Sequence, residues 1–274
     1  MGVAMLRGAH QLLDDPKVFD DPLAIAIAGG EDAVRAHIAE REHTSLGPFL
    51  RAFIAARSRL AEDQLAAAMA RGVRQYVVLG AGLDTFAYRQ RFTPAALRVF
   101  EVDHPSTQAW KRERLTAAGI TIPPNVVYAE ADLKHHGLPE SLAAAGLDAT
   151  RPAFFAWLGV TMYLEKPAAI ATLRYAAEAS RGGGGIVFDH LVDPSSLPPP
   201  VRAVFDQMAE RVAHAGEPWV SHFTPEEVVR DLRRSGFSVA EDLDGDELNR
   251  RYFIGRSDGL RVGSLSRIAI GNRE

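Results

Sequence analysis

The stretch Gln75-Tyr-Val-Val-Leu-Gly-Ala-Gly-Leu-Asp-Thr-Phe-Ala-Tyr-Arg89 decides the fold. A short apolar run, residues 76 to 79, leads into a Gly-x-Gly turn at Gly80 and Gly82, and Asp84 follows. Glycines in such a turn let the backbone approach a ligand closely, and the start of the next helix offers unpaired N–H groups. A strand, a glycine turn and an acid in this order predict the binding site of a nucleotide-like cofactor.

A second acidic segment, Val99-Phe-Glu-Val-Asp-His-Pro105, has the pattern of the next strand and contains Glu101 and Asp103. In a doubly wound fold, an acid roughly twenty residues beyond the glycine turn accepts hydrogen bonds from the two ribose hydroxyls. Asp103 is the better candidate because it is nearest the strand end. The position three beyond Gly82 is not the third glycine that a dinucleotide pyrophosphate requires. S-adenosylmethionine, which carries no phosphate, fits the pattern better.

Apolar β-type runs alternate with helical stretches along the rest of the chain. The runs span residues 76–79, 98–102, 126–130, 153–157, 186–190, 237–240 and 267–270. This alternation predicts an α/β fold with a doubly wound, mostly parallel seven-stranded sheet, whose last strand is antiparallel at or near the edge. Residues 1–71 have helical patterns, so we expect an N-terminal helical cap followed by one compact cofactor-binding catalytic domain, residues 72–274.

Composition narrows the class of protein further. The 274 residues are 47% hydrophobic, carry a net charge of −4 and contain no cysteine. No basic run mixed with aromatic residues appears, so we expect no nucleic-acid partner. No apolar run is long enough to span a bilayer or to form a signal peptide, which predicts a cytoplasmic protein without a membrane partner. No metal-ligand spacing is present, so we expect no metal. The oligomeric state stays open.

Several motifs resemble the leucine carboxyl methyltransferase family, which includes bacterial polyketide carboxyl O-methyltransferases. The most specific are LGAGLDT at residues 79–85 and FEVDHP at 100–105, and WLGVTMYL at 157–164 also matches. The resemblance implies a class I, Rossmann-like methyltransferase fold with S-adenosylmethionine as cofactor. It also implies O-methylation of the carboxylate of a small molecule, a natural product of secondary metabolism or another metabolite.

The resemblance also assigns roles to cofactor residues. It places Arg57 against the methionine carboxylate of the cofactor, with Arg59 as the alternative inward-facing arginine. It places Asp132 at the adenine amino group, with the backbone of Leu133 beside it. The full set of candidate cofactor residues is Arg57, Gly80, Ala81, Gly82, Asp84, Glu101, Asp103, Asp132 and Leu133.

One position departs from the family pattern. Many relatives have a glutamate where this chain has Leu158. The change implies weaker cofactor binding, a different substrate orientation or, in the extreme case, a catalytically degenerate scaffold that keeps the fold.

Methyl transfer from a sulfonium is an in-line displacement, and an ionised carboxylate acceptor needs no general base. We expect Tyr163 and His190, at the ends of the fourth and fifth strands, to face the substrate as catalytic residues. The alternatives are that Tyr163 is a core aromatic and that His190 only caps its strand. If the acceptor is a phenol or an alcohol, His190 with Asp189 or His222 is the natural base. The sequence does not separate the carboxylic acid from the phenol.

Overall fold

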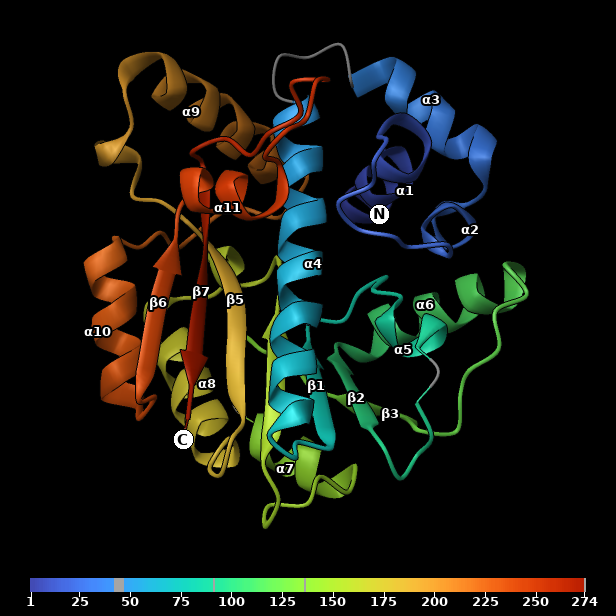
Figure 1. Cartoon of the computed structure of the whole chain (residues 1–274), viewed down its shortest axis with the longest axis vertical. Coiled ribbons are helices and arrows are strands. Elements are labelled where there is room, and N and C mark those ends of the chain that lie inside the picture. The colour runs from blue at the N-terminus through green and yellow to red at the C-terminus, as the bar shows by residue number, and fades with distance from the viewer. Residues whose placement is uncertain (42–46, 91, 136, 274) are drawn as a thin grey trace.

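The computed structural model describes residues 1–41, 47–90, 92–135 and 137–273 (Figure 1). Its sheet has seven strands in the order β3-β2-β1-β4-β5-β7-β6, and β7 is antiparallel to both of its neighbours. The strands are β1 (Gln75–Leu79), β2 (Arg98–Asp103), β3 (Val126–Glu130), β4 (Ala153–Trp157), β5 (Gly185–Leu191), β6 (Val239–Leu243) and β7 (Ser266–Asn272). The predicted doubly wound, mostly parallel seven-stranded sheet is therefore confirmed.

The helices occupy the segments between the strands and the N-terminal region. They are α1 (Gly2–Leu13), α2 (Ala24–Ala28), α3 (Glu31–Arg41), α4 (Gly47–Ala70), α5 (Phe86–Arg89), α6 (Pro105–Ala117), α7 (Leu138–Ala144), α8 (Lys166–Ala179), α9 (Pro199–His214), α10 (Pro225–Ser235) and α11 (Gly245–Tyr252). Two 3₁₀ turns, η1 (Thr161–Tyr163) and η2 (Pro194–Ser196), follow β4 and β5.

Apolar side chains form two core layers, one on each face of the sheet. Val78 and Phe154 join the core layer that includes residues of α1 and α4, whereas Val77 and Phe155 join the layer that includes residues of α7, α8 and α10. A strand places successive side chains on opposite faces, so every central strand feeds both layers. We refer to these faces as the α4 face and the α8 face.

The carboxyl ends of the six mutually parallel strands lie at one end of the molecule. Figure 1 shows α1, α2, α3, α9 and α11 gathered at that end, while α4 runs along the face of the sheet. Contacts of α4 with β4 and β5 make this helix a layer of the sheet sandwich, although the sequence placed it in the cap. The division into a cap of residues 1–71 and a domain of residues 72–274 stays a prediction, and residues 42–46 and 274 lie outside the described part.

The sixth strand begins later than predicted. Gly236 ends α10 in a left-handed conformation with a φ of +115°, and the N–H of Phe237 still bonds back to Leu232. Phe237 is buried in the α8-face layer, so its apolar character reflects the helix end and not the strand. The capping box of Thr224 and Glu227 at the start of the same helix is present as predicted.

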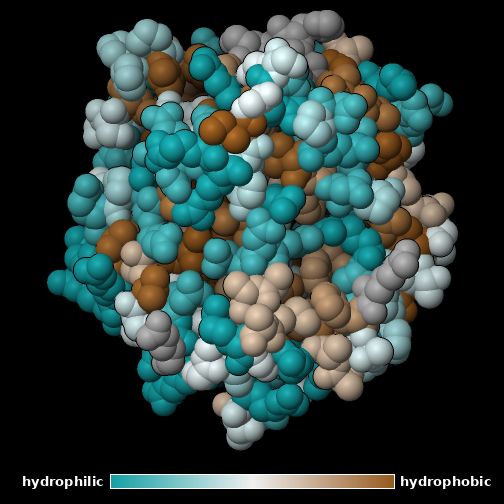
Figure 2. All heavy atoms as spheres, viewed as in Figure 1, coloured by the Kyte–Doolittle hydropathy of each residue, from teal (hydrophilic) through white to brown (hydrophobic). Residues whose placement is uncertain are grey.

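Polar and apolar side chains are mixed over the face that carries α4. Figure 2 shows small apolar patches separated by hydrophilic groups on this side of the molecule. Within the described residues, no helix has the length and hydropathy needed to cross a bilayer.

Candidate functional site

The glycine turn after β1 is fixed by its neighbours. Gly80 and Gly82 adopt φ values of +65° and +43°, and the N–H groups of Gly80 and Ala81 donate to the carbonyl of Val102. A Cβ on Gly80 would lie 2.3 Å from Cγ2 of Val160. Glycine is therefore required at position 80 by packing against the segment after β4 as well as by its backbone conformation.

Asp103 lies at the end of β2, directly beside this turn. Its Oδ2 accepts a hydrogen bond from the N–H of Gly82 at 2.7 Å, and its Oδ1 accepts one from the N–H of His104 at 2.7 Å. A carboxylate has about four acceptor sites, so two remain for further donors. Asp103 is only half buried. Its contact with a ribose stays a prediction.

Glu101 has a different environment, and its predicted cofactor role is wrong. Its side chain is fully buried, accepts a hydrogen bond from the Tyr88 hydroxyl at 2.7 Å and forms an ion pair with Lys111 Nζ at 2.8 Å. Burial raises the pKa of the Glu101 carboxyl. Glu101 lies two residues before Asp103, so both side chains are on the same face of the strand. Asp103 is at the strand end, whereas Glu101 is in the interior, covered by α6. The carboxyl has no exposed surface for a ribose.

Asp84 sits at the start of α5 and contacts the N-terminal region. Its Oδ1 accepts a hydrogen bond from the N–H of Phe86 at 2.8 Å, and its Oδ2 lies 3.8 Å from Arg7 Nη1. Arg7 also donates to the carbonyl of Leu83 and pairs with Asp21, at 2.5 and 3.2 Å. Asp84 therefore helps to join the glycine turn to α1, and its contact with a cofactor stays a prediction.

Asp21 is a functional candidate that sequence reasoning missed. It is fully buried, and its Oδ2 accepts a hydrogen bond from Thr85 Oγ1 at 2.6 Å. Arg89 lies 3.7 Å from Asp21 and also pairs with Glu62 of α4. The segment Asp20-Asp-Pro-Leu-Ala24 contains Asp21 and was the available signal, but its partner Thr85 is 64 residues away in the chain. Residues of the cap thus hold the glycine turn from outside.

Arg57 of α4 points into the structure. Its guanidinium is 6% exposed and its Nη1 donates to Asp189 Oδ2 at 2.5 Å. The other oxygen of Asp189 accepts a hydrogen bond from the N–H of Gly159 at 2.5 Å. Arg59 instead is 50% exposed and pairs with Asp63 on the same helix. Of the two arginines that the sequence proposed, only Arg57 lies among the residues at the ends of β4 and β5.

His190 does not face this site, which corrects the sequence prediction. Its side chain is fully buried, its Nε2 lies 2.8 Å from Asp242 Oδ1 and its Nδ1 lies 3.2 Å from the carbonyl of Leu191. The ring packs edge-on against Phe223. Because successive side chains of β5 alternate, Asp189 faces α4 and His190 faces the opposite side of the sheet. Both ring nitrogens have partners in the interior, so His190 is no catalytic base.

Tyr163 lies in η1, the turn that follows β4, and is half buried. Burial, with the charge of Glu217 as a smaller cause, raises the pKa of the Tyr163 hydroxyl. The Tyr163 ring packs with Trp219 around a small apolar cluster of Met162, Leu191 and Phe205. A neutral phenol carries one O–H group that can donate a hydrogen bond. Tyr163 is therefore a neutral hydrogen-bond donor near the end of the sheet, and its contact with a substrate stays a prediction.

Asp132 and Leu133 follow β3. The N–H of Lys134 donates to Asp132 Oδ1 at 2.9 Å, and His135 Nδ1 lies 2.8 Å from Oδ2. These two contacts lower the pKa of Asp132, which is therefore ionised at neutral pH. Leu133 packs against the α8-face core layer. Asp132 is thus an exposed, ionised acceptor in this loop, and its contact with the adenine stays a prediction.

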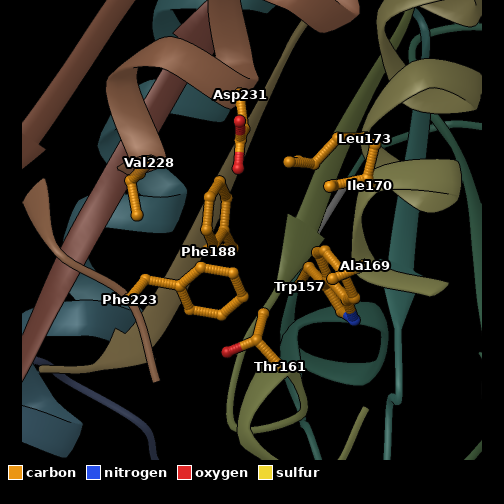
Figure 3. Close-up of a pocket in the computed structure, with 9 residues that line it drawn as sticks. All are labelled: Trp157, Thr161, Ala169, Ile170, Leu173, Phe188, Phe223, Val228 and Asp231. Atoms are coloured by element: carbon orange, nitrogen blue, oxygen red, sulfur yellow. The ribbon is translucent and has the colours of Figure 1, made fainter. Parts of the chain in front are cut away.

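A small void lies on the α8 face, away from these residues. Figure 3 shows Trp157, Phe188 and Phe223 around it, between the strands and helices α8 and α10. Its volume is about 10 Å³, which is at the lower limit for a single water molecule. The void is a packing defect and not a site for a substrate.

Comparisons with known proteins agree with this geometry. The profile of the Leucine carboxyl methyltransferase family matches residues 1–177. YktD of Bacillus subtilis, a candidate S-adenosyl-L-methionine-dependent methyltransferase, is 30% identical over 279 residues that cover 94% of this chain and 91% of YktD. Another such candidate, from Mycobacteroides abscessus, is 32% identical over 198 residues that cover 72% of this chain and 65% of that protein.

A solved structure supports the fold. The crystal structure of a candidate methyltransferase from Thermobifida fusca superposes with a TM-score of 0.59 at 23% identity, covering 91% of this chain and 92% of that one. At this identity the likeness concerns the fold alone.

The residues present fit S-adenosylmethionine. Nε of Arg57 is buried and has no hydrogen-bond partner among the described residues, and Asp103 keeps acceptor capacity at the glycine turn. The family match includes the turn, Asp103 and Arg57. The chain belongs to the leucine carboxyl methyltransferase family and is an S-adenosylmethionine-dependent methyltransferase.

Proposed function

We propose that the protein is an O-methyltransferase that methylates the carboxylate of a small molecule, a natural product or another metabolite. One observation carries the proposal: the histidine that would serve as a base is buried on the α8 face, while a neutral hydroxyl donor, Tyr163, lies at the end of the sheet. An ionised carboxylate needs a donor to orient it and no base to deprotonate it.

In this proposal Asp103 accepts hydrogen bonds from the ribose, and Arg57 binds the methionine carboxylate. The backbone of Gly80, Ala81 and Gly82 forms the wall beside the methionine chain. Asp132 accepts from the adenine amino group, next to the backbone of Leu133. S-adenosylmethionine supplies a methyl group activated by its sulfonium.

The protein's own task is to orient the acceptor and to keep water away from it. Tyr163 donates its phenolic proton in a hydrogen bond to one oxygen of the acceptor carboxylate, and the other oxygen attacks the methyl carbon. The new C–O bond forms as the C–S bond breaks, with the bonding pair going to sulfur. Holding the oxygen about 3 Å from the carbon supplies much of the rate.

A second candidate is transfer to a phenol or an alcohol with His222 as the base. His222 lies in the segment between α9 and α10, and burial lowers its pKa below its ordinary value of 6.5. A neutral imidazole at physiological pH can accept a proton. In that case the rate rises with pH through a value below 6.5, and the rise disappears in His222→Ala.

The test is a methyl-transfer assay with labelled S-adenosylmethionine and matched panels of carboxylic acids and phenols. We expect label in base-labile methyl esters and a rate that is constant from about pH 6 to 9, where carboxylates are already ionised. Label in stable aryl ethers, together with a rate that depends on His222, would overturn the carboxyl proposal.

The degenerate-scaffold alternative has its own test. Leu158 is half buried and packs against the α4-face core layer, so the fold accommodates an apolar residue there. We expect turnover in the native chain. If native protein binds the cofactor without turnover and Leu158→Glu creates it, the chain is a degenerate relative.

A further inference from the structure

We propose that Asp189 is a positioning residue, which holds the Arg57 guanidinium so that one edge of it is presented to the carboxylate of the cofactor. The inference rests on the proposed placement of Arg57. The sequence suggested Asp189 only as the partner of a catalytic base. Here Asp189 supplies a carboxylate beside Arg57, whereas the side chain at position 158 is apolar.

The contacts of Asp189 leave it no freedom. Its Oδ2 accepts a hydrogen bond from Arg57 Nη1 at 2.5 Å, and its Oδ1 accepts one from the N–H of Gly159 at 2.5 Å. Its backbone carbonyl accepts a hydrogen bond from the hydroxyl of Thr161 at 2.6 Å. The carboxylate is 1% exposed, so it acts on a ligand through Arg57 and not by contact.

The remaining donors of Arg57 lie along one edge of the guanidinium. Nη1 is used by Asp189, while Nε is buried without a partner among the described residues, and no bond of Nη2 to them is present. Nε and Nη2 form the edge that binds a carboxylate through two parallel hydrogen bonds. A buried N–H without a partner is costly, which points to an acceptor supplied by a ligand.

Gly159 leaves room for the guanidinium of Arg57. Its φ is +73°, and a Cβ added there would lie 3.0 Å from Arg57 Nη2 and 3.2 Å from Nη1. A side chain at position 159 would therefore press on the guanidinium. Gly159 also donates its N–H to Asp189. The same glycine therefore orients the Asp189 carboxylate and leaves room for the Arg57 guanidinium that this carboxylate holds.

The charge of the pair is balanced in the interior. Arg57 lies beside Phe53 on its own helix, and the side chain at 158 is apolar, so Asp189 is the carboxylate that neutralises Arg57 among the described residues. Arg57 can then bind the cofactor carboxylate without being drawn toward another acid. Removing the charge of Asp189 frees the guanidinium to turn, and the orientation of its Nε edge is lost.

The test compares two ligands that differ only in the part that Arg57 binds. S-adenosylhomocysteine carries the amino-acid moiety, and 5′-methylthioadenosine lacks it. We expect Asp189→Asn to weaken binding of S-adenosylhomocysteine about tenfold, and to leave binding of methylthioadenosine within about twofold of native, measured by calorimetry. Arg57→Ala should weaken S-adenosylhomocysteine at least as much, and the double variant should add nothing.

Asp14→Asn is the matched control, because Asp14 forms a similar buried pair with Arg51 of the same helix, at 2.8 Å. It should leave the ratio of the two affinities unchanged. If Asp189→Asn does not fold, Asp189→Glu tests the same point, because a glutamate keeps the charge but moves the carboxylate by one methylene and so shifts the guanidinium that it holds. Arg57→Lys tests the placement of Arg57, because a lysine keeps the charge but has no second edge to offer. A selective loss of S-adenosylhomocysteine supports the inference.

Two results separate the failures. If Arg57→Ala and Arg57→Lys weaken both ligands equally or neither, the proposed placement of Arg57 is wrong. If Arg57→Ala is selective but Asp189→Asn leaves the ratio at the native value, the placement stands and the positioning role of Asp189 is overturned.

Discussion

Asp103 and Glu101 are two carboxylates on the same face of the same strand, and their environments are opposite. Asp103, at the strand end, is half buried and accepts hydrogen bonds from two backbone N–H groups. Glu101, two residues earlier, is fully buried and paired with Lys111. The carboxylate at the strand end keeps free acceptor sites, whereas the carboxylate in the interior is paired with Lys111 of α6. We therefore expect Asp103 to serve ligand binding and Glu101 to serve stability.

The largest effect that we expect is a loss of stability when the charge of Glu101 is removed. Glu101→Gln leaves Lys111 buried without a charged partner, which costs about 3 to 5 kcal/mol when one member of a buried pair is removed. We expect urea denaturation to show this loss, while the affinity for S-adenosylhomocysteine at a temperature where the variant is folded stays within about threefold of native. A parallel loss of affinity would mean that Glu101 also serves the ligand.

His190 extends the comparison to β5. His190→Ala removes a partner of the buried Asp242 and leaves space beside Phe223, so we expect it to lower the free energy of unfolding by about 2 to 3 kcal/mol. Methyl transfer by the folded variant should keep the native rate and pH dependence. A selective loss of turnover, with stability unchanged, would return His190 to the catalytic machinery.

Tyr163 is the counterpart of Asp103 at the end of β4. Tyr163→Phe removes the hydroxyl that we propose donates to the acceptor carboxylate, and such a bond to a charged group is worth about 1.5 kcal/mol. We expect kcat/KM for the acceptor to fall about tenfold, with cofactor affinity and stability near native. Unchanged transfer kinetics would show that Tyr163 is only a packed aromatic against Trp219.

The smallest effect that we expect comes from a local contact, the capping box at the start of α10. Thr224→Ala removes one half of the capping box of α10, which is distant from Asp103 in the sheet order. We expect the free energy of unfolding to fall by about 1 kcal/mol and the transfer rate to stay native. A change in the rate would show that α10 is coupled to the site.

The fold could be predicted from the sequence because its signals are local. Apolar runs of strand length, separated by helical stretches, gave six strands nearly in their observed places. The remaining strand, β6, was predicted from residue 237 but begins at Val239. Phe237 is apolar because it packs in the α8-face core layer at the end of α10 and not because it belongs to the strand. The capping box at Thr224 depends only on residues three apart, so it was also predictable.

The sequence predicted which acid lies beside the glycine turn, but not which candidate residues are buried. Asp103 followed from its spacing to the glycine turn, whereas Glu101 and His190 were assigned to the ligand because a sequence shows neither depth along a strand nor which face a neighbouring helix covers. The pairing of Arg57 with Asp189 joins residues 132 apart, and that of Arg7 with Leu83 joins residues 76 apart. No local sequence pattern predicts contacts between residues so far apart in the chain.

The most direct test of the account is calorimetric titration of native protein, Asp103→Ala and Glu101→Gln with S-adenosylmethionine and S-adenosylhomocysteine. We expect micromolar binding by the native protein and near-native affinity in Glu101→Gln. In Asp103→Ala we expect a loss of about 100-fold or more, because hydrogen bonds to a charged acceptor are removed. Native affinity in Asp103→Ala, or no binding by the native protein, would contradict it.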